Sequence, residues 1–421
     1  FLHTAHFTVV YILGANVLGL ALALMIWKSS RFNNVIRTLL FMPFTVSLVA
    51  ATKVWSYVYT DVLMPLTGMP SPLGISSQVI YGLAAIAIWR DMGYCMLIYI
   101  AALQSIPGEY YEAARVEGAN FWHEFRSITL PMIVPAITAN VTLVLSWGLR
   151  CFDYSQMVLN MKAAKTTAVF VYEYIFGNSR AGLGQAGAII LTLVLGVLSN
   201  IVTTVLRKMA QSARSASVYF GKNVNRTRRR GMIRGAVRVI VLLVIVGIVL
   251  TPFYISLLYS IKSHSDISLN RLAWPEEPTL DNYSRVIQEN KYVAIGFKNS
   301  ILTTIPTTLI LLFTTSMASY VLAGYNSRFY KVMYSLFISG VLVPFQCIML
   351  PLYVNIYNMG LASTNLGFIL ARSGFQVSIS VLSVTGFVKG IPRDLEQAAN
   401  IDGCGRFRTF WQIVFPLMTP I

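Results

Sequence analysis

The sequence predicts an all-α, polytopic membrane protein that is built from two homologous halves. Apolar residues make up 56% of its 421 residues and charged residues only 12%, whereas soluble domains carry roughly 25% charged residues. Apolar runs of about 20 residues recur along the chain, and each is long enough to cross the hydrocarbon core as a helix. One short polar pattern occurs twice, 285 residues apart, which indicates an internal repeat.

Nine segments are apolar enough and long enough to span a membrane as helices. The first contains no Lys, Arg, Asp or Glu and ends at Lys28. The other eight are free or nearly free of charge, and polar or proline-containing stretches separate them. In chain order, the nine predicted spans are 7–27, 38–59, 79–105, 133–152, 186–206, 239–260, 299–324, 332–356 and 366–388.

The net charge of +17 is compatible with nucleic-acid binding or with basic residues kept on the cytoplasmic side of a membrane. The distribution favours the second interpretation, because segment 207–238 carries ten Lys or Arg and no acid. We therefore expect no nucleic-acid partner. A site for anionic lipid head groups in this segment is the alternative to a simple positive-inside anchor.

This basic segment fixes the predicted orientation. If 207–238 is cytoplasmic, counting spans places both copies of the polar pattern in the cytoplasm as well. Segment 262–298, which holds five acids, then lies outside. The two halves are expected at 1–206 and 239–421, with 207–238 as a flexible linker between them.

The first half has about five spans and the second about four, with no span after its polar pattern. By symmetry, we expect the sequence to be truncated at both ends. The complete chain would have twelve spans, in two sets of six.

The polar pattern places two alanines after a Glu or Gln and a glycine six positions after that residue. Ile-Pro precedes each copy, and an aromatic residue, an isoleucine and two prolines follow it. The pattern residues are Glu112, Ala113, Ala114, Glu117 and Gly118 in the first copy and Gln397, Ala398, Ala399, Asp402 and Gly403 in the second.

This pattern predicts a bent pair of short helices at the membrane surface. Pro107 and its equivalent suit the first helical turn, where the helix dipole favours the acids that follow. Gly118 and Gly403 suit left-handed helix ends. Two copies of such a knob predict two docking points for a soluble partner. The alternative is a helix that only lies on the bilayer, but such helices favour Lys and Arg, and these first turns are acidic.

The pattern resembles the EAA loop, E-A-A-x-x-x-G followed by I-x-x-P, in the permease subunits of bacterial ABC importers. The segment AALQSIPGEYYEAARVEGANFWHEFRSITLPMIVPA is typical of sugar permeases, and WPEEPTLDNYSRVI is similar to maltose and glycerol-phosphate permeases. The resemblance covers nearly the whole chain. It implies the permease fold of these importers and two permease subunits fused in one chain.

The same resemblance implies the partners and the localisation. Two ATP-binding cassette subunits would dock at the cytoplasmic face and bind the ATP, and an extracytoplasmic solute-binding protein would deliver substrate. The chain would be a multi-pass protein of a bacterial or archaeal inner membrane, surrounded by lipid bilayer.

The second copy departs from the family pattern at Gln397, where the first copy has Glu112. In the family this Glu helps to fix the loop to basic residues of the ATPase. Gln keeps the size and hydrogen-bonding capacity of Glu but loses the charge. Glu396 lies about 100° round the helix from position 397, so it is an imperfect substitute, and the second docking site is expected to be weaker.

Charged residues inside membrane spans are costly and therefore candidates for function. Arg90 and Asp91 lie near the middle of one predicted span, and Arg372 lies near the middle of its equivalent. They could bind a hydroxylated or anionic substrate, or Arg90 could form a structural ion pair. Polar Asn140 and Gln376 are further candidates for the substrate pathway, or else join helices. Trp89 and Tyr94 could stack on a sugar or anchor the chain at the interface.

The sequence contains no phosphate-binding G-x-x-x-x-G-K-[ST] motif, no clustered metal ligands and no nucleophile–base pair. We therefore expect a transport subunit without cofactor, metal or enzymatic chemistry of its own. A carbohydrate importer is the primary interpretation. The alternatives are an ABC permease for a polyamine, phosphate or peptide, and a secondary transporter of two repeats.

Overall fold

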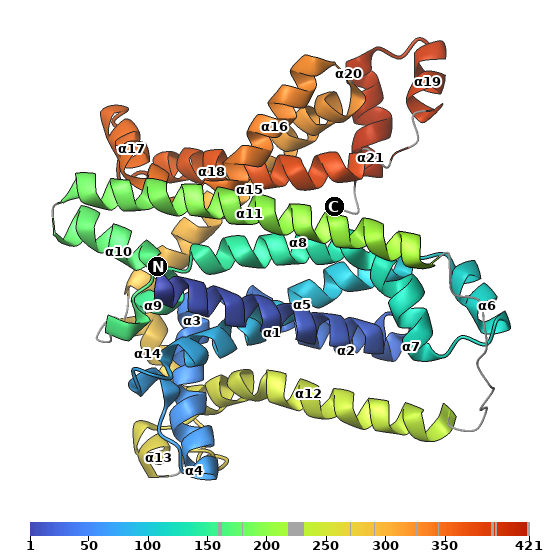
Figure 1. Ribbon diagram of the computed structural model, residues 1–421. Coiled ribbons are helices and arrows are strands. Elements are labelled where there is room, and N and C mark those ends of the chain that lie inside the picture. The colour runs from blue at the N-terminus through green and yellow to red at the C-terminus, as the bar shows by residue number, and fades with distance from the viewer. Residues whose placement is uncertain are drawn as a thin grey trace. The chain divides into compact units, whose positions relative to one another are not determined.

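The computed structural model describes residues 1–418 except 159–161, 179, 218–230, 270, 290, 326, 344, 389–390 and 392–393. The described residues form helices and no strand (Figure 1), as predicted. The chain divides into two compact units, Phe1–Tyr283 and Ser284–Ile421. The predicted boundary at 207–238 follows the sequence repeat rather than the packing and stays a prediction. Residues 218–230 of that linker lie outside the described residues.

The first unit contains the helices of the first sequence half together with α12. Its helices are α1 (Leu2–Ile26), α2 (Arg31–Phe41), η1 (Met42–Thr45), α3 (Leu48–Tyr57), η2 (Val58–Leu63), α4 (Met64–Thr67), η3 (Pro72–Gly74), α5 (Val79–Gln104), α6 (Gly108–Val116), α7 (Phe121–Glu124), η4 (Phe125–Thr129), α8 (Leu130–Leu149), α9 (Asp153–Gln156), η5 (Lys162–Ala164), α10 (Thr167–Tyr172), η6 (Glu173–Gly177), α11 (Ala181–Ser217), α12 (Gly231–Ser260) and α13 (His264–Leu269).

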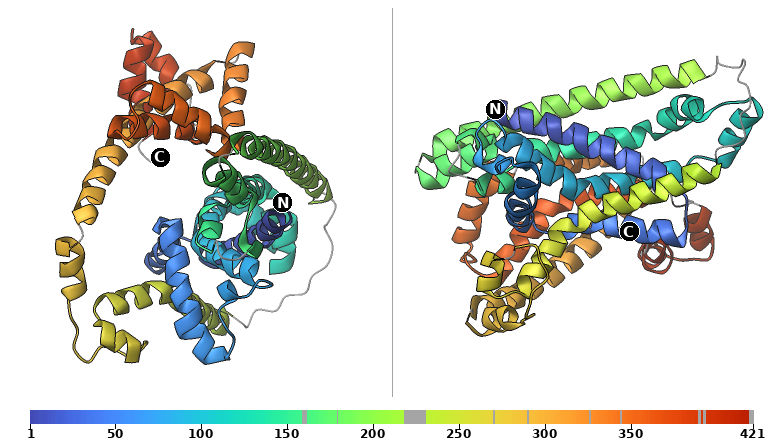
Figure 2. Two further views of the ribbon diagram at one scale, coloured as in Figure 1. Left: turned by 90° about the vertical axis from the view of Figure 1, so that its left-hand side faces the viewer. Right: turned by 90° about the horizontal axis from the view of Figure 1, so that it is seen from below.

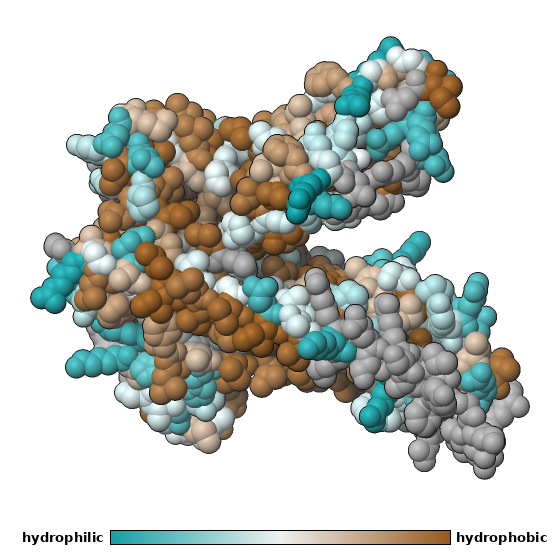
Figure 3. Space-filling view, turned by 45° about the horizontal axis from the view of Figure 1, so that its top comes forward, coloured by the Kyte–Doolittle hydropathy of each residue, from teal (hydrophilic) through white to brown (hydrophobic). Residues whose placement is uncertain are grey.

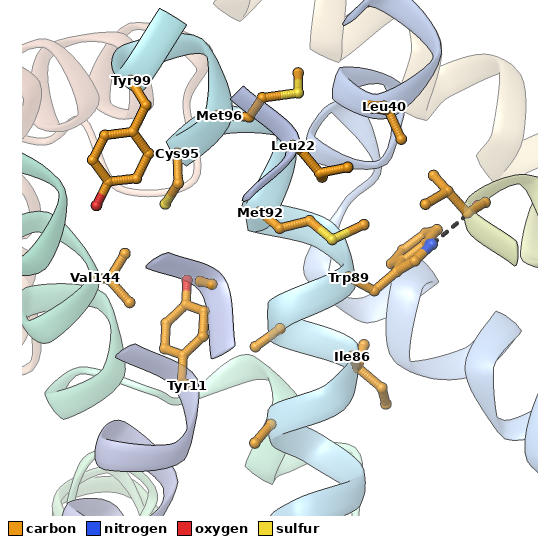
Figure 4. Packing of buried hydrophobic residues seen from close by; sticks show 14 of the residues in the cluster. Tyr11, Leu22, Leu40, Ile86, Trp89, Met92, Cys95, Met96, Tyr99 and Val144 are labelled. Atoms are coloured by element: carbon orange, nitrogen blue, oxygen red, sulfur yellow. Dashed lines mark hydrogen bonds between the residues drawn. The ribbon is translucent and has the colours of Figure 1, made fainter. Parts of the chain in front are cut away.

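Helix α5 forms the centre of the first unit, packed against α1, α2 and α8. The end-on view in Figure 2 shows α1, α5, α8 and α11 gathered into one bundle. Figure 4 shows the core around α5, where Tyr11 and Tyr99 are almost fully buried. In the same view, the Trp89 indole donates a hydrogen bond to the Val249 carbonyl of α12 at 3.0 Å. Helix α12 therefore packs on the first half, although it follows the linker in sequence.

The second unit repeats the central helix pair of the first. Helix α15 packs along α18 there, as α1 packs along α5. In each pair, the helix that leads into the polar pattern (α5 or α18) packs against an equivalent helix (α1 or α15). The remaining helices are α14 (Asp281–Glu289), α15 (Lys291–Gly324), α16 (Arg328–Leu342), α17 (Phe345–Asn358), α18 (Asn365–Val388), α19 (Asp394–Ile401), α20 (Arg406–Thr409), η7 (Phe410–Val414) and α21 (Phe415–Leu417).

Two of the nine predicted spans are wrong as continuous helices. Among the described residues, seven helices are long and apolar enough to cross a membrane, or up to eight if one bent pair counts as a span. That pair, Arg31–Thr45 and Leu48–Thr67, bends by 102° within the predicted span 38–59. Segment 332–356 is split between α16 and α17, of 15 and 14 residues. At about 1.5 Å per residue, neither crosses 30 Å alone.

Each break occurs beside a proline. Pro43 lies in the short turn η1, and extended Val46 follows that turn. Val343 is extended and directly precedes Pro344 in the sequence, where the proline ring disfavours helical backbone. On the face shown in Figure 3, apolar residues cover broad stretches of the helices, and hydrophilic residues gather toward their ends.

Candidate functional site

The first repeat segment (residues 107–131) forms the predicted bent helix pair. Helix α6 ends at Gly118, whose φ of 83° is left-handed. The Ala119 amide donates to the Ala114 carbonyl at 2.9 Å, and the Gly118 amide donates to the Arg115 carbonyl at 3.1 Å. These bonds are the Schellman ending of a helix. Helix α7 then begins under an Asn120 cap, whose side chain accepts the His123 amide at 2.8 Å.

The second repeat segment (residues 392–416) has the same backbone geometry, although Pro392 itself lies outside the described residues. Gly403 ends α19 with a φ of 79°, and the Cys404 amide donates to the Ala399 carbonyl at 2.9 Å. Both segments then pass through a π-helical turn at equivalent positions, η4 (Phe125–Thr129) and η7 (Phe410–Val414). Each turn precedes the proline at position 131 or 416, which supplies no amide for a regular helical bond.

Most of the predicted docking residues face solvent within their own unit. Glu112, Ala113 and Glu117 are exposed, whereas Ala114 and Gly118 are half-buried. In the second segment only Ala399 is buried; the exposed members are Gln397, Ala398, Asp402 and Gly403. Within the described part of the chain, the exposed residues of the two patterns occupy matching positions, and their side chains make no hydrogen bond or ion pair.

Two apolar positions on this surface were missed by the sequence analysis. Val116 and its equivalent Ile401 are 88% and 86% exposed, and Trp122 and Phe407 are 64% and 67% exposed. A large apolar side chain exposed at the same repeat position in both halves makes these residues candidates for contact with a partner. The signal was present in the sequence as apolar residues inside an otherwise polar segment.

The two segments differ in the side-chain contacts that hold their helices in place. In the first, the Tyr111 hydroxyl lies 3.0 Å from the Thr129 hydroxyl, and burial raises the pKa of Tyr111 above its ordinary value. An Arg115–Glu124 ion pair of 2.9 Å joins α6 to α7. In the second segment, Glu396 stands at the position of Tyr111 and accepts a 3.4 Å hydrogen bond from Tyr320 of α15.

The position of Glu396 decides a question left open by the sequence. Because its carboxylate is half-buried and faces Tyr320, it is turned toward the membrane helices and does not replace the charge missing at Gln397. No counterpart of the Arg115–Glu124 pair can form in the second segment, because the equivalent residues are Asn400 and Thr409.

Arg90 and Asp91 form an ion pair of 2.6 Å in which Asp91 is only 3% exposed. Asp91 also accepts a hydrogen bond from the Tyr11 hydroxyl. The Arg90 guanidinium donates to the Val46 carbonyl at 3.0 Å and lies over the Phe44 ring at 4.9 Å. Arg90 thus supplies a hydrogen bond to the Val46 carbonyl, which the break in the helix leaves without a helical partner. This is the structural alternative raised for the pair, and a role in the substrate pathway stays a prediction.

The other pathway candidates are distributed over both units. Asn140 is fully buried and donates to the Cys95 carbonyl of α5 at 3.1 Å, so it joins two helices. Arg372 is exposed and Gln376 half-buried, both on α18 of the second unit. The structure does not bring these two residues together with Arg90 and Asp91 in one compact unit.

A cluster of aromatic rings lies next to Arg90. The Phe44 and Tyr94 rings stack at 4.7 Å, and the Trp147 ring lies 5.5 Å from that of Tyr94. All three side chains are only half-buried. Of the three, only Tyr94 was predicted from the sequence, because Phe44 and Trp147 come from η1 and α8 and meet Tyr94 only in the folded chain. Trp89, the other aromatic candidate, is 5% exposed and packed in the core.

Within the described residues, no three His, Cys, Asp or Glu side chains are grouped to hold a metal ion. The family described as "Binding-protein-dependent transport system inner membrane component" matches residues 15–215 and 310–421. The match falls once in each sequence half.

Curated relatives carry similar descriptions. "Probable starch degradation products transport system permease protein AmyD" of Thermoanaerobacterium thermosulfurigenes is 30% identical over 47% of this chain and 71% of its own. AmyC, from the same organism and similarly named, is 35% identical to this chain, and the match covers 42% of this chain and 66% of AmyC. "Multiple sugar-binding transport system permease protein MsmG" of Streptococcus mutans is 34% identical, and the match covers 43% of this chain and 66% of MsmG.

A bacterial ABC transporter involved in the import of the acidic polysaccharide alginate is among the similar solved structures. It has a TM-score of 0.45 and 22% identity, and the similarity covers 49% of this chain and 77% of the other.

Proposed function

Because the chain belongs to the family of binding-protein-dependent transport system inner membrane components, we propose that it forms the membrane pathway of an ATP-driven carbohydrate importer. It is a multi-pass membrane protein and a transport subunit, and its partners are components of the same ABC transport system. We place it in the inner membrane of a bacterial or archaeal cell. The observation that carries the proposal is the repeat segment, built twice with the same helix ending and with exposed apolar residues at the same positions.

Each repeat segment would dock one ATP-binding cassette subunit, which makes two per chain. In support, Val116 with Trp122 and Ile401 with Phe407 are exposed apolar residues at matching positions, and an exposed acid, Glu117 or Asp402, follows the first of each pair. Large exposed aromatic and aliphatic side chains of this kind anchor protein interfaces. These ATPase subunits, rather than this chain, would bind ATP.

A carbohydrate substrate is supported by two observations. Relatives of this chain are described as permeases for starch degradation products and for multiple sugars. The half-buried rings of Phe44, Tyr94 and Trp147 offer apolar faces next to a guanidinium, a combination that suits a ligand with both apolar faces and hydroxyl groups.

Transport would proceed by alternating access. Closure of the ATPase dimer on ATP would move the two repeat segments and, through them, the helices to which they are attached. Tyr111, whose ring lies 6.3 Å from that of Trp27 at the end of α1, and Glu396, which accepts a hydrogen bond from Tyr320 of α15, make the contacts that would pass this motion on. A solute would enter from the binding protein outside and leave on the cytoplasmic side after hydrolysis.

The proposal is tested by reconstituting the chain with its ATPase subunits and solute-binding protein in vesicles. Uptake of a maltodextrin should require ATP on the side of the membrane where the ATPase subunits are bound. It should persist when ion gradients are collapsed. Uptake driven by an ion gradient alone would instead identify a secondary transporter. ATP-driven uptake of a polyamine, phosphate or peptide, but of no sugar, would contradict the carbohydrate assignment.

Variants of the aromatic cluster test the substrate site. Trp147→Ala and Tyr94→Ala should each raise the KM for sugar uptake about tenfold, which corresponds to a loss of 1.4 kcal/mol. The matched control is Phe32→Ala, because Phe32 is 42% exposed on α2 and belongs to no ring cluster described here. An unchanged KM in both cluster variants would place the sugar elsewhere.

A further inference from the structure

Three basic residues lie where the turn between α1 and α2 meets the start of α12, and they are here called the basic corner (Lys28, Arg31 and Arg238). The Arg238 guanidinium donates a hydrogen bond from Nη2 to Asn33 Oδ1 at 3.0 Å. The Asn33 side chain in turn donates to the Lys28 carbonyl at 2.7 Å. Arg238 of α12 is therefore held against the α1–α2 turn, on which the side chains of Lys28 and Arg31 are exposed.

No acid compensates the charge of the basic corner. The sequence has no Asp or Glu in residues 1–60 or 174–265. Among the described residues, none of the three cations forms an ion pair, and Nε of Arg238 is buried without a hydrogen-bond partner. Arg37 is used differently, because its Nη2 donates to two carbonyls at the end of α1 at 2.7 and 2.8 Å. The basic corner thus keeps a positive charge that an anion would neutralise.

An exposed apolar stripe of α12 begins beside the basic corner. At about 100° per residue, positions 237, 240, 241, 244 and 248 share one side of the helix. The exposed residues on this side are Val237, Ile240, Val241, Val244 and Ile248. Leu242 and Val249, on the other side, are buried in the unit. Arg238 lies between the two sides, so its guanidinium borders the exposed stripe.

The position of α12 makes this stripe accessible within the first unit. Helix α12 packs against α2 and α3 and lies at the edge of the unit (Figure 1). Its residues Val237–Ser260 are long and apolar enough to cross a membrane. A cationic group therefore stands at one end of an apolar helix face of membrane-spanning length.

We propose that the basic corner binds the phosphate of an anionic phospholipid, whose acyl chains lie along the exposed stripe of α12. The guanidinium fork suits phosphate oxygens, and basic pockets between membrane helices bind anionic head groups. A free phosphate matches the charge of the corner but not the apolar stripe, whereas a phospholipid matches both. The lipid would join α12 to the α1–α2 turn. This site goes beyond the proposed function and requires only that α1 and α12 cross a membrane.

Native mass spectrometry of the full chain in detergent tests the proposal with phosphatidylglycerol and phosphatidylcholine. Wild type should bind phosphatidylglycerol more tightly. Arg238→Gln and Arg31→Gln should each raise its Kd about fivefold and leave the Kd for phosphatidylcholine unchanged. The matched control is Arg180→Gln, which removes the same charge from an exposed residue at the start of α11, at the opposite end of the unit from the α1–α2 turn (Figure 1).

A further variant separates lipid binding from a structural role of Arg238. Arg238→Lys keeps the charge and should retain most of the preference for phosphatidylglycerol. If Arg238→Gln lowers thermal stability but leaves the lipid preference as in wild type, Arg238 is structural and the proposal is overturned. If Arg238→Gln does not fold, Arg31→Gln decides the question, because the Arg31 side chain is exposed.

Competition with inorganic phosphate distinguishes a lipid from a free anion. Phosphate at the same concentration should leave phosphatidylglycerol bound, because it cannot replace the contacts of the acyl chains. Equal displacement by phosphate would show a site for free anions and would overturn the lipid assignment. Equal Kd values for the two lipids in wild type would overturn it too. These measurements need no ATPase subunit and no sugar, so their failure would leave the proposed function untouched.

Discussion

At the scale of single residues, the two repeat segments have the same backbone and unequal chemistry. Glu112 and Gln397 occupy equivalent, exposed positions, so the first segment offers a carboxylate where the second offers an amide. Glu396 is half-buried and accepts a hydrogen bond from Tyr320 of α15, so its carboxylate is directed toward that helix rather than toward the exposed side of α19. A charged acceptor forms roughly twice as strong a hydrogen bond as a neutral one.

The first prediction follows from this difference in charge. Glu112→Gln should lower transport-coupled ATPase activity more than Gln397→Ala, because only the first change removes a charge from a docking surface. Gln397→Glu should strengthen ATPase binding at the second segment. Coupled ATPase rates in proteoliposomes are the measurement, and equal losses for Glu112→Gln and Gln397→Ala would contradict the asymmetry.

The second prediction concerns the helix endings. Gly118→Ala and Gly403→Ala should each destabilise the helix ending by about 1–2 kcal/mol, because an L-residue with a side chain is strained in the left-handed region. The strain should loosen the segment and weaken ATPase binding to the permease, measured by co-purification. Gly405→Ala is the control, since Gly405 has an ordinary φ of −66°; an equal effect there would argue against backbone strain.

At the scale of elements, the broken helices determine which polar side chains are structural. The break between η1 and α3 places the Val46 carbonyl within reach of Arg90, and Asp91 balances the charge of Arg90 in the core. In the second unit, Phe345 follows the corresponding break, and its ring packs on Phe375 of α18 at 5.6 Å. With the repeat offset of 285, Phe375 is equivalent to Arg90. In each half, a ring near the break thus packs on this position of the long helix, which holds a cation in one half and a phenyl ring in the other.

The third prediction tests this structural role. Arg90→Gln should lower the stability of the transporter by about 3–5 kcal/mol, because Asp91 is left buried without its counter-charge. Adding Asp91→Asn should restore part of the loss. Thermal unfolding in detergent is the measurement. Stability equal to wild type in Arg90→Gln, together with lost uptake, would instead assign Arg90 to the substrate pathway.

At the scale of the whole molecule, the order of the chain and its packing differ. Helix α12 begins the second sequence half but packs in the first unit, where Val249 meets Trp89 and Arg238 meets Asn33 at 3.0 Å. Arg271, in the segment that follows α12, adds an ion pair with Asp61. The helix therefore ties the start of one half to the body of the other.

The fourth prediction is that these contacts hold the halves together without the covalent linker. When residues 1–206 and 207–421 are produced as separate chains in one cell, they should co-purify. Removal of α12 from the second chain should reduce recovery of the complex severalfold, because its helix–helix contacts are lost. Recovery that is independent of α12 would show that other contacts suffice.

Much of the fold and part of the site could be predicted from the sequence. Of the nine spans predicted from apolar runs, seven are single long helices in the described part of the chain, and the glycines of the repeat predicted the two left-handed helix ends. Val116 and Trp122 could have been predicted as well, from their repeat positions. The aromatic cluster could not, because Phe44, Tyr94 and Trp147 have no common spacing.

The sequence by itself determined the membrane class, the family and the doubled segment, because hydropathy, helix-ending glycines and repeated spacing are properties of neighbouring residues. Tertiary structure alone decided where a span breaks, which partner satisfies Arg90, that Glu396 turns inward, and that α12 packs on the first half. Each of these depends on contacts between residues far apart in the chain, where a single buried carbonyl or carboxylate must find its partner.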